Sequence, residues 1–256
     1  MTTLFDHWGL LWRFVECDIK IRYKQAVLGA LWAVVSPLAM LLIVTVVFSR
    51  YAQSDLGRVP YPIYAYCGIS LWSFFSSALA MACTSLVDSR DLITAVYFRR
   101  EILPFSKIGS RFLDFAVGSL LLLLLMQWYK IPLSPHVLLA PAILCCQLMV
   151  MAGFALLLAA GQLFFRDVKL LFDVAILLWL FATPVFYPLT ALAPHFRWLA
   201  LLNPLTPIIE SYRSLLIYGQ LPSTLLVGLS LAYGLGIYGL GLTVFRKLDP
   251  LLAEYV

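Results

Sequence analysis

The stretch that decides the fold is residues 22–38, RYKQAVLGALWAVVSPL. Arg22 and Lys24 close a charge-rich segment, and an uncharged run follows them directly and continues to Ser49. This run is longer than the roughly 20 residues that an α-helix needs to cross a bilayer. A soluble protein has no use for a basic segment joined without a linker to such a run. We therefore expect a membrane protein.

The composition of the whole chain supports this expectation. Of its 256 residues, 62% are hydrophobic and only 12% are charged, and the mean hydropathy is +0.93. Ordinary globular domains are about 25% charged. So few charged side chains cannot cover the surface of a soluble protein of this size, which leaves lipid to cover it. We also expect no cleavable signal peptide, because the first residues lack a basic segment followed by an uninterrupted apolar core.

Six segments are long and apolar enough to cross a bilayer as helices. None alternates polar and apolar residues in the manner of a membrane β-barrel, so the sequence predicts an all-α, polytopic fold with six spans. The six segments are 25–49, 59–87, 112–129, 131–165, 174–195 and 214–245.

The positions of the basic residues predict the orientation. With both termini in the cytoplasm, the inner segments 1–29, 88–111, 166–169 and 246–256 hold 13 of the 18 Lys and Arg residues. The positive-inside rule favours this arrangement. Because basic residues beside a membrane face anionic lipid, the net charge of +5 requires no nucleic-acid partner.

We treat residues 1–256 as a single transmembrane domain with three features outside the spans. Residues 1–25 form an amphipathic helix, expected to lie in the membrane interface, on which Leu4, Trp8, Leu11, Trp12, Val15 and Ile19 recur at helical spacing. Residues 88–104 form the longest cytoplasmic connection. Its apolar middle, residues 92–98, is compatible with a helix and is a candidate docking element for a partner protein, with a second interfacial helix as the alternative. Residues 184–222 contain six prolines yet stay apolar, which predicts two short re-entrant helices at the outer face.

No enzyme site can be assembled from this sequence. It has no metal-binding pattern, no Gly-x-Ser-x-Gly, and no lysine preceded by glycine, so it lacks a phosphate loop of the Gly-Lys-Ser/Thr kind. We interpret the five cysteines as buried, inert thiols. Charges near the membrane are few, and their spacing predicts three ion pairs: Arg111 with Asp114, Lys169 with Asp173, and Glu210 with Arg213.

Three motifs give the chain a family resemblance. The stretch at 22–38, the segment FFRDVKLLFDVAILLWLFATPVFYP at 164–188 and the segment LLNPLTPIIESYRSLL at 201–216 resemble type-2 ABC exporter permeases that move polysaccharides. These include the export subunits for O-antigen, capsule and teichoic acid. The similarity covers nearly the whole chain, and it implies a part in lipopolysaccharide biosynthesis at a bacterial cytoplasmic (inner) membrane.

The resemblance implies partners and a docking site. It implies a homodimer with two copies of a separate cytoplasmic ATPase, which would hold the ATP and Mg²⁺ because this chain has no cofactor site of its own. The 88–104 connection would be the coupling segment that enters a groove of the ATPase. Its residues are Asp88, Arg90, Asp91, Leu92, Tyr97, Phe98, Arg99, Arg100 and Glu101.

The cargo implied by the resemblance is a glycan on a polyprenyl pyrophosphate carrier. We expect the pyrophosphate to enter beside Arg13, Arg22 and Lys24, whose side chains can bind phosphate oxygens. Anchoring of these residues to lipid headgroups is the alternative. Aromatic rings suit stacking on sugars, although most will serve packing or the interfacial belt. The candidates for the glycan path are Trp32, Tyr66, Trp72, Phe74, Phe75, Phe181 and Tyr187.

Three other functions stay open at this point. The first is a type-2 ABC permease for a small drug or lipid, which would use the same machinery for a different cargo. The second is a membrane-embedded enzyme of lipid-linked glycan assembly, for which we find no cluster of polar catalytic groups. The third is a scaffold or assembly subunit with no part in transport.

Overall fold

The computed structural model describes residues 4–24, 32–52, 59–96 and 98–255, and every regular element in these ranges is a helix. The predicted all-α class is confirmed for this part of the chain. The elements are α1 (Leu4–Lys24), α2 (Trp32–Ala52), α3 (Tyr61–Asp88), α4 (Arg90–Ala95), α5 (Ile102–Trp128), η2 (Pro135–Leu139), α6 (Ala140–Phe164), α7 (Val168–Ala182), η3 (Leu189–Ala191), α8 (Pro194–Leu201), α9 (Leu205–Leu216) and α10 (Thr224–Tyr255).

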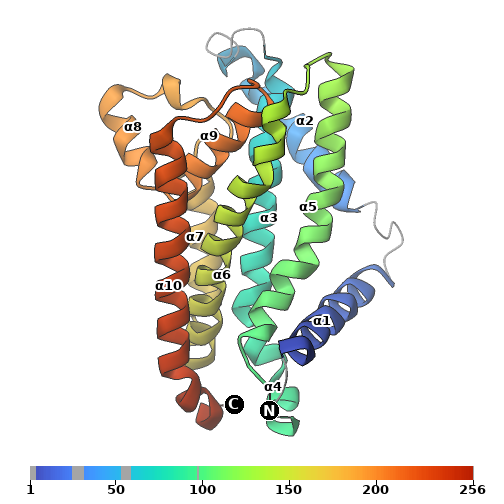
Figure 1. Cartoon of the computed structure of the whole chain (residues 1–256), viewed down its shortest axis with the longest axis vertical. Helices are drawn as coiled ribbons and strands as arrows, with labels where there is room; N and C mark the ends of the chain where they lie inside the picture. The colour runs from blue at the N-terminus through green and yellow to red at the C-terminus, as the bar shows by residue number, and fades with distance from the viewer. Residues whose placement is uncertain (1–3, 25–31, 53–58, 97, 256) are drawn as a thin grey trace.

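The long helices run side by side along the longest axis of the molecule (Figure 1). Both chain ends and α4 lie at one end, which we call the termini end. Helices α8 and α9 lie at the opposite end, which we call the α8–α9 end. Helix α1 crosses the bundle obliquely near the termini end and packs against α5.

Within the described residues, four helices are long and apolar enough to cross a membrane: Tyr61–Thr84, Ile102–Trp128, Pro135–Phe164 and Thr224–Pro250. Helix α2 contains a shorter apolar segment, Val35–Val47, and α7 has 15 residues. Four such helices make this a multi-pass membrane protein.

Several helix boundaries differ from the uncharged runs in the sequence. Helix α5 begins at Ile102 rather than 112, because its charged side chains are paired with α1 and with one another and so do not interrupt it. Helix α7 occupies Val168–Ala182 rather than 174–195, and Pro184 and Pro188 follow its end. Helix α10 extends to Tyr255, well past the end of the 214–245 run.

Helix α3 is the central element of the bundle. Nineteen of its 28 residues are buried, and it packs against α2, α5, α6, α7 and α9. Helices α6 and α10 approach so closely that a Cβ on Gly153 would lie 2.3 Å from the carbonyl oxygen of Ile237. A Cβ on Gly241 would lie 2.4 Å from the carbonyl oxygen of Gly153. Glycine is therefore required at both positions, and α6 and α10 are packed as a tight pair.

Candidate functional site

The N-terminal helix α1 is fixed to α5 by a small apolar contact. Val15 is 4% exposed and lies over Gly109, where a Cβ would come within 2.8 Å of the Val15 Cγ2 atom. Beside this contact, Lys107 Nζ donates to Asp18 Oδ1 at 2.7 Å, and both side chains are largely buried. The helix predicted for residues 1–25 is thus present as α1, and it is docked on the bundle.

A second ion cluster joins α1 to α5 one turn further along. Arg22 Nη1 donates to Asp114 Oδ2 at 2.6 Å, and Arg111 Nη1 donates to the same oxygen at 3.1 Å. Both guanidinium groups also approach the sulfur of Met81 on α3, and Arg22 Nη2 donates to the hydroxyl of Ser110. The predicted Arg111–Asp114 pair is confirmed, and Arg22 proves to be part of the same cluster. The pyrophosphate role of Arg22 stays a prediction.

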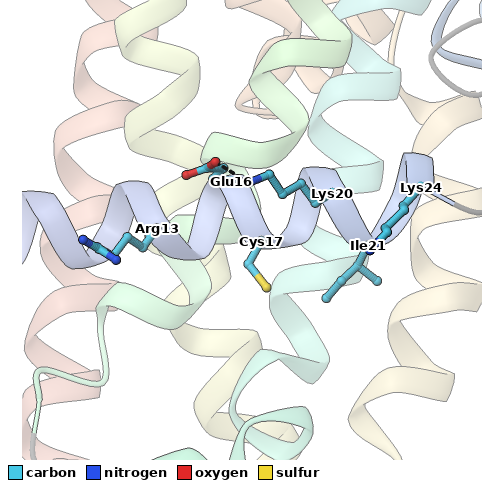
Figure 2. Close-up of a pocket in the computed structure, with 6 residues that line it drawn as sticks. All are labelled: Arg13, Glu16, Cys17, Lys20, Ile21 and Lys24. Atoms are coloured by element: carbon cyan, nitrogen blue, oxygen red, sulfur yellow. Dashed lines mark hydrogen bonds and ion pairs between the residues drawn. The ribbon is translucent and has the colours of Figure 1, made fainter.

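The side of α1 that faces away from the bundle carries charged residues (Figure 2). It presents Arg13, Glu16, Lys20 and Lys24 together with Cys17 and Ile21. Cys17 and Cys145 are exposed, so the prediction of five buried thiols is wrong for these two. Lys20 donates to Glu16 at 2.6 Å; this hydrogen bond and the Lys20 charge lower the pKa of Glu16, and the pKa of Lys20 is raised in return. Arg13 and Lys24 are exposed, so they are available to an anionic headgroup.

The apolar residues of α1 do not share one environment. Val15 is buried against α5, whereas Trp8 is 70% exposed and Trp12 is 66% exposed. The two indole rings are thus not covered by α5. Their position at the headgroup region of a membrane stays a prediction.

The candidate coupling segment forms a short helix, α4, between α3 and α5. The sequence placed the helical part at 92–98, and the structure places it at Arg90–Ala95. Leu92, Ile93 and Phe98 are half-buried against the apolar cluster beneath them, and the Phe98 ring lies 6.0 Å from that of Phe14 on α1.

The remaining residues of this segment divide between exposed and bonded positions. Asp91, Val96 and Arg99 are exposed, Arg90 is half-exposed, and Asp88 accepts a hydrogen bond from Thr84 at 2.7 Å. Tyr97 lies outside the described residues. Helix α4 is therefore held by its apolar residues, with polar and apolar groups displayed at the termini end.

Two ion pairs attach the base of this segment to the last turns of α10. Arg100 Nη1 donates to Asp249 Oδ1 at 3.0 Å and to the backbone oxygen of Asp249 at 2.7 Å. Arg246 Nε donates to Glu101 Oε1 at 2.9 Å. The end of α10 is consequently tied to the residues that connect α4 with α5.

Arg213 occupies a buried position at the α8–α9 end. Its side chain is fully buried, and Nη1 donates to the Tyr64 hydroxyl at 2.6 Å, to the Pro184 carbonyl at 2.7 Å and to Glu210 Oε1 at 2.7 Å. Nη2 donates to the Val185 carbonyl at 2.6 Å, and the guanidinium lies 3.7 Å from the centroid of the Tyr64 ring. The predicted Glu210–Arg213 pair is confirmed, and it joins α9, α3 and the turn after α7.

Asn203 reinforces this end of the molecule. Its Oδ1 accepts from Trp179 Nε1 at 3.0 Å and from the Leu205 amide at 3.0 Å, and its Nδ2 donates to the Thr183 hydroxyl at 2.7 Å. The end of α7 and the start of α9 are thereby fixed to one side chain. The two short helices expected within 184–222 are present as α8 and α9.

Most of the aromatic candidates for a glycan path lie inside the helix bundle. Tyr66, Trp72, Phe74 and Phe75 are buried in α3, and the Tyr66 hydroxyl donates to the Gly118 carbonyl at 3.1 Å. Burial on the central helix gives these rings a packing role. Phe181 is exposed, and Tyr187 is half-buried, with its hydroxyl donating to the Phe181 carbonyl. The side chain of Trp32 lies outside the described part. The assignment of these residues to a glycan path stays a prediction.

Several contacts that organise both ends of the bundle could not be predicted from the sequence. Asp18 with Lys107, Arg100 with Asp249, and Tyr64 with Arg213 are separated by 89 to 149 positions, and one sequence carries no signal for such pairing. The predicted Lys169–Asp173 pair, four residues apart, is confirmed. Across the described ranges, no group of three or more His, Cys, Asp or Glu residues could hold a metal ion.

These elements define the class of protein, which is a helical membrane protein. Outside its bundle it has α1 docked on α5, the short helix α4 at the termini end, and the short helices α8 and α9 at the opposite end. The family is then given by comparison. Residues 10–217 match the family model for the ABC-2 type transporter. The chain belongs to this family, so it is a membrane permease subunit, a transport component without a catalytic domain.

Named relatives cover nearly all of the chain. It is 30% identical over 221 residues to the O-antigen export system permease protein RfbA of Myxococcus xanthus, a match that covers 86% of this chain and 84% of that protein. It is 28% and 27% identical to two proteins of the same name from Klebsiella pneumoniae, over 98% of this chain and 95% of each relative. The resemblance noted from the sequence is confirmed.

Proposed function

We propose that this chain is the membrane-spanning subunit of an ATP-driven exporter that moves a polyprenyl-pyrophosphate-linked polysaccharide, similar to O-antigen, across the bacterial cytoplasmic membrane. The observation that carries the proposal is the similarity over nearly the full length to three O-antigen export permeases. The similarity to these permeases includes the segments at both ends of the bundle. In the proposed exporter, the partner ATPase and the cargo would bind at these ends.

The proposed topology has six spans and cytoplasmic termini. Helices α2, α3, α5, α6, α7 and α10 are the spans, and the inner segments then carry most of the basic residues. In this orientation the termini end faces the cytoplasm. Helices α8 and α9 then lie at the outer leaflet as the re-entrant region, where the buried Arg213 network supplies the hydrogen bonds that backbone at such depth requires.

The proposed assembly is a homodimer with two copies of a cytoplasmic ABC ATPase. The coupling segment would dock in a groove of the ATPase through the residues that α4 and its neighbours display. Because Phe98 contacts Phe14 and because Arg100 and Glu101 bind the end of α10, motion of α4 would reach both α1 and α10. ATP closure of the two ATPases would thus be transmitted to the bundle.

The proposed cargo entry lies beside α1. Arg13 and Lys24 are exposed on its outer side, and Trp8 and Trp12 would hold this helix at headgroup depth. A pyrophosphate reaching this surface would meet two cationic side chains near the Arg22 cluster. Phe181 and Tyr187, at the end of α7, are the candidates that lie outside the protomer core.

The experiment that tests the proposal is native mass spectrometry of the chain co-expressed with the ABC ATPase encoded beside it. Two copies of each subunit with a retained lipid-linked sugar would support the exporter and name the cargo. A 2:2 complex that retains a small drug or a lipid without sugar would favour the other ABC cargo class. A chain that never captures the ATPase would contradict the proposal.

A deletion across 92–98 tests the docking segment separately. We expect the dimer to insert into the membrane but to lose its ATPase. Export and ATPase association that both survive this deletion would show that the coupling assignment is wrong.

A further inference from the structure

The Arg22 cluster joins α1 to α3 and α5. It consists of Arg22 on α1, Met81 on α3, and Ser110, Arg111 and Asp114 on α5. The side chains of Arg22, Arg111 and Asp114 are 20%, 26% and 19% exposed, so the cluster is partly buried and can still be reached from outside. The proposed function places the cargo entry beside this cluster but gives no role to Asp114 or Arg111.

The charged groups of the cluster are two cations and one anion. Nη1 of Arg22 and Nη1 of Arg111 donate to the same carboxylate oxygen, Asp114 Oδ2, at 2.6 and 3.1 Å. The net charge of these three side chains is therefore +1. Arginine binds carboxylate and phosphate oxygens through the same N–H donors. Two guanidinium groups that converge on one oxygen thus form an anion-binding site, which the Asp114 carboxylate occupies.

Other donors of the two arginines are directed at weaker acceptors. Arg111 Nε lies 3.0 Å from the sulfur of Met81, and Arg22 Nη2 lies 3.3 Å from the same sulfur and 3.3 Å from the Ser110 hydroxyl oxygen. A thioether sulfur is a weak hydrogen-bond acceptor, and 3.3 Å is long for an N–H···O bond. A phosphate group would offer these donors several charged oxygens. The cluster therefore suits an anion that has more oxygens than a carboxylate.

A change of partner at Arg22 would leave α1 attached to the bundle. Val15 packs on Gly109, and Lys107 donates to Asp18 at 2.7 Å, one turn before Arg22. Arg22 itself belongs to the last turn of α1. Its side chain can therefore exchange Asp114 for another anion while the rest of the helix keeps its contacts with α5.

We propose that the Asp114 carboxylate is a placeholder for the phosphate of the cargo, and that Arg111 binds the cargo together with Arg22. This inference rests on the proposed function, because it takes the carrier to be a polyprenyl pyrophosphate. A pyrophosphate carries more negative charge than one carboxylate, so it displaces Asp114 from the two arginines. The singly charged headgroup of a phospholipid has no such advantage, and Asp114 selects against it. When the cargo leaves, Asp114 returns to the arginines.

The test is native mass spectrometry of the delipidated chain titrated with undecaprenyl pyrophosphate or with phosphatidylglycerol. The unmodified protein is expected to bind undecaprenyl pyrophosphate in preference. Asp114→Asn removes the competing charge and keeps the shape of the side chain, so it should bind undecaprenyl pyrophosphate about tenfold more tightly. Arg111→Gln should bind it about tenfold more weakly.

Matched controls come from charged residues outside the cluster. Asp173→Asn removes an aspartate that is paired with Lys169 on α7, and Arg166→Gln removes an exposed arginine between α6 and α7. Both should leave the binding of undecaprenyl pyrophosphate unchanged. Asp114→Glu keeps the negative charge and should bind this lipid no more tightly than the unmodified protein, which separates the effect of charge from that of repacking.

A purely structural role of Asp114 predicts a different result. Its replacement would then lower the unfolding temperature without tightening the binding of undecaprenyl pyrophosphate. An Asp114→Asn protein that binds no more tightly than the unmodified protein would overturn the proposal. So would unchanged binding by Arg111→Gln, a result that does not require the Asp114 variant to fold, or binding of phosphatidylglycerol that equals that of undecaprenyl pyrophosphate.

These outcomes are separate from the test of the proposed function. A chain that forms the 2:2 complex with its ATPase and retains a lipid-linked sugar, but whose variants at Asp114 and Arg111 bind like the unmodified protein, contradicts this inference alone. A chain that never captures the ATPase contradicts the proposed function.

Discussion

At the scale of single residues, Arg213 holds three separate parts of the chain together at the α8–α9 end. It is fully buried and donates to two backbone carbonyls, a hydroxyl and a carboxylate from three parts of the chain. Arg213→Met would leave Glu210 and these acceptors without their donor, and breaking a buried pair in this way costs about 3–5 kcal/mol. We expect a marked fall in the thermal unfolding temperature measured in detergent.

Two further variants serve as references for the unfolding temperature of Arg213→Met. Tyr64→Phe keeps the ring under the guanidinium and removes one acceptor of Arg213, so its cost should be smaller, about 1.5–3 kcal/mol. Arg99→Met removes an exposed arginine and should change the unfolding temperature little. Equal unfolding temperatures for Arg213→Met and Arg99→Met would contradict the structural role of Arg213.

Gly68 is required by the same buried network. A Cβ at this position would lie 2.6 Å from Arg213 Nη2 and 2.7 Å from the Val185 carbonyl oxygen. Gly68→Ala should therefore lower the unfolding temperature and the yield of folded protein. Gly236→Ala is the matched control: no atom lies within 4 Å of its Cβ, and alanine favours a helix over glycine by up to about 1 kcal/mol. A Gly68→Ala protein as stable as the control would show that this contact relaxes without cost.

At the scale of elements, the docking of α1 on α5 depends on close approach at Gly109. Gly109→Leu would push against Val15 and separate Asp18 from Lys107. We expect faster hydrogen exchange in the amides of residues 8–24, because the helix loses its support. Gly9→Leu is the matched control on α1 itself, since its Cβ would meet nothing within 4 Å. Unchanged exchange in the Gly109→Leu protein would mean that α1 is held elsewhere.

The same elements show what a single sequence can predict. Long apolar runs predict the helical class, and proline spacing predicts that α8 and α9 are two short helices. Pairs three or four residues apart, such as Arg111 with Asp114, follow from helix geometry. The partner of Asp18 does not follow, because Lys107 is 89 residues away. The burial of Tyr66 does not follow either, because apolar residues lie on every side of α3 and only packing decides which side faces a neighbour.

At the scale of the whole molecule, the two ends of the bundle are built differently. The α8–α9 end is fixed by the buried networks of Arg213 and Asn203. At the termini end, the end of α10 is joined to the segment between α4 and α5 by two ion pairs that are partly exposed, Arg100–Asp249 and Arg246–Glu101. Partly exposed pairs are weaker and more readily exchanged than buried networks. Rearrangement during transport is therefore expected at the termini end, where the coupling segment lies.

This difference predicts how the coupling segment passes its motion to α10. Arg100→Glu would place a carboxylate beside Asp249 and repel it. In the proposed exporter, we expect the ATPase to remain bound while the amount of glycan exported per ATP hydrolysed falls several-fold. The reciprocal variant Arg100→Glu with Asp249→Arg restores opposite charges and should recover part of the lost export. Lys247→Glu is the control for a charge reversal that breaks no ion pair of this segment, since Lys247 is exposed beside Arg246. A reciprocal variant that exports no better than Arg100→Glu would show that this ion pair does not transmit the motion.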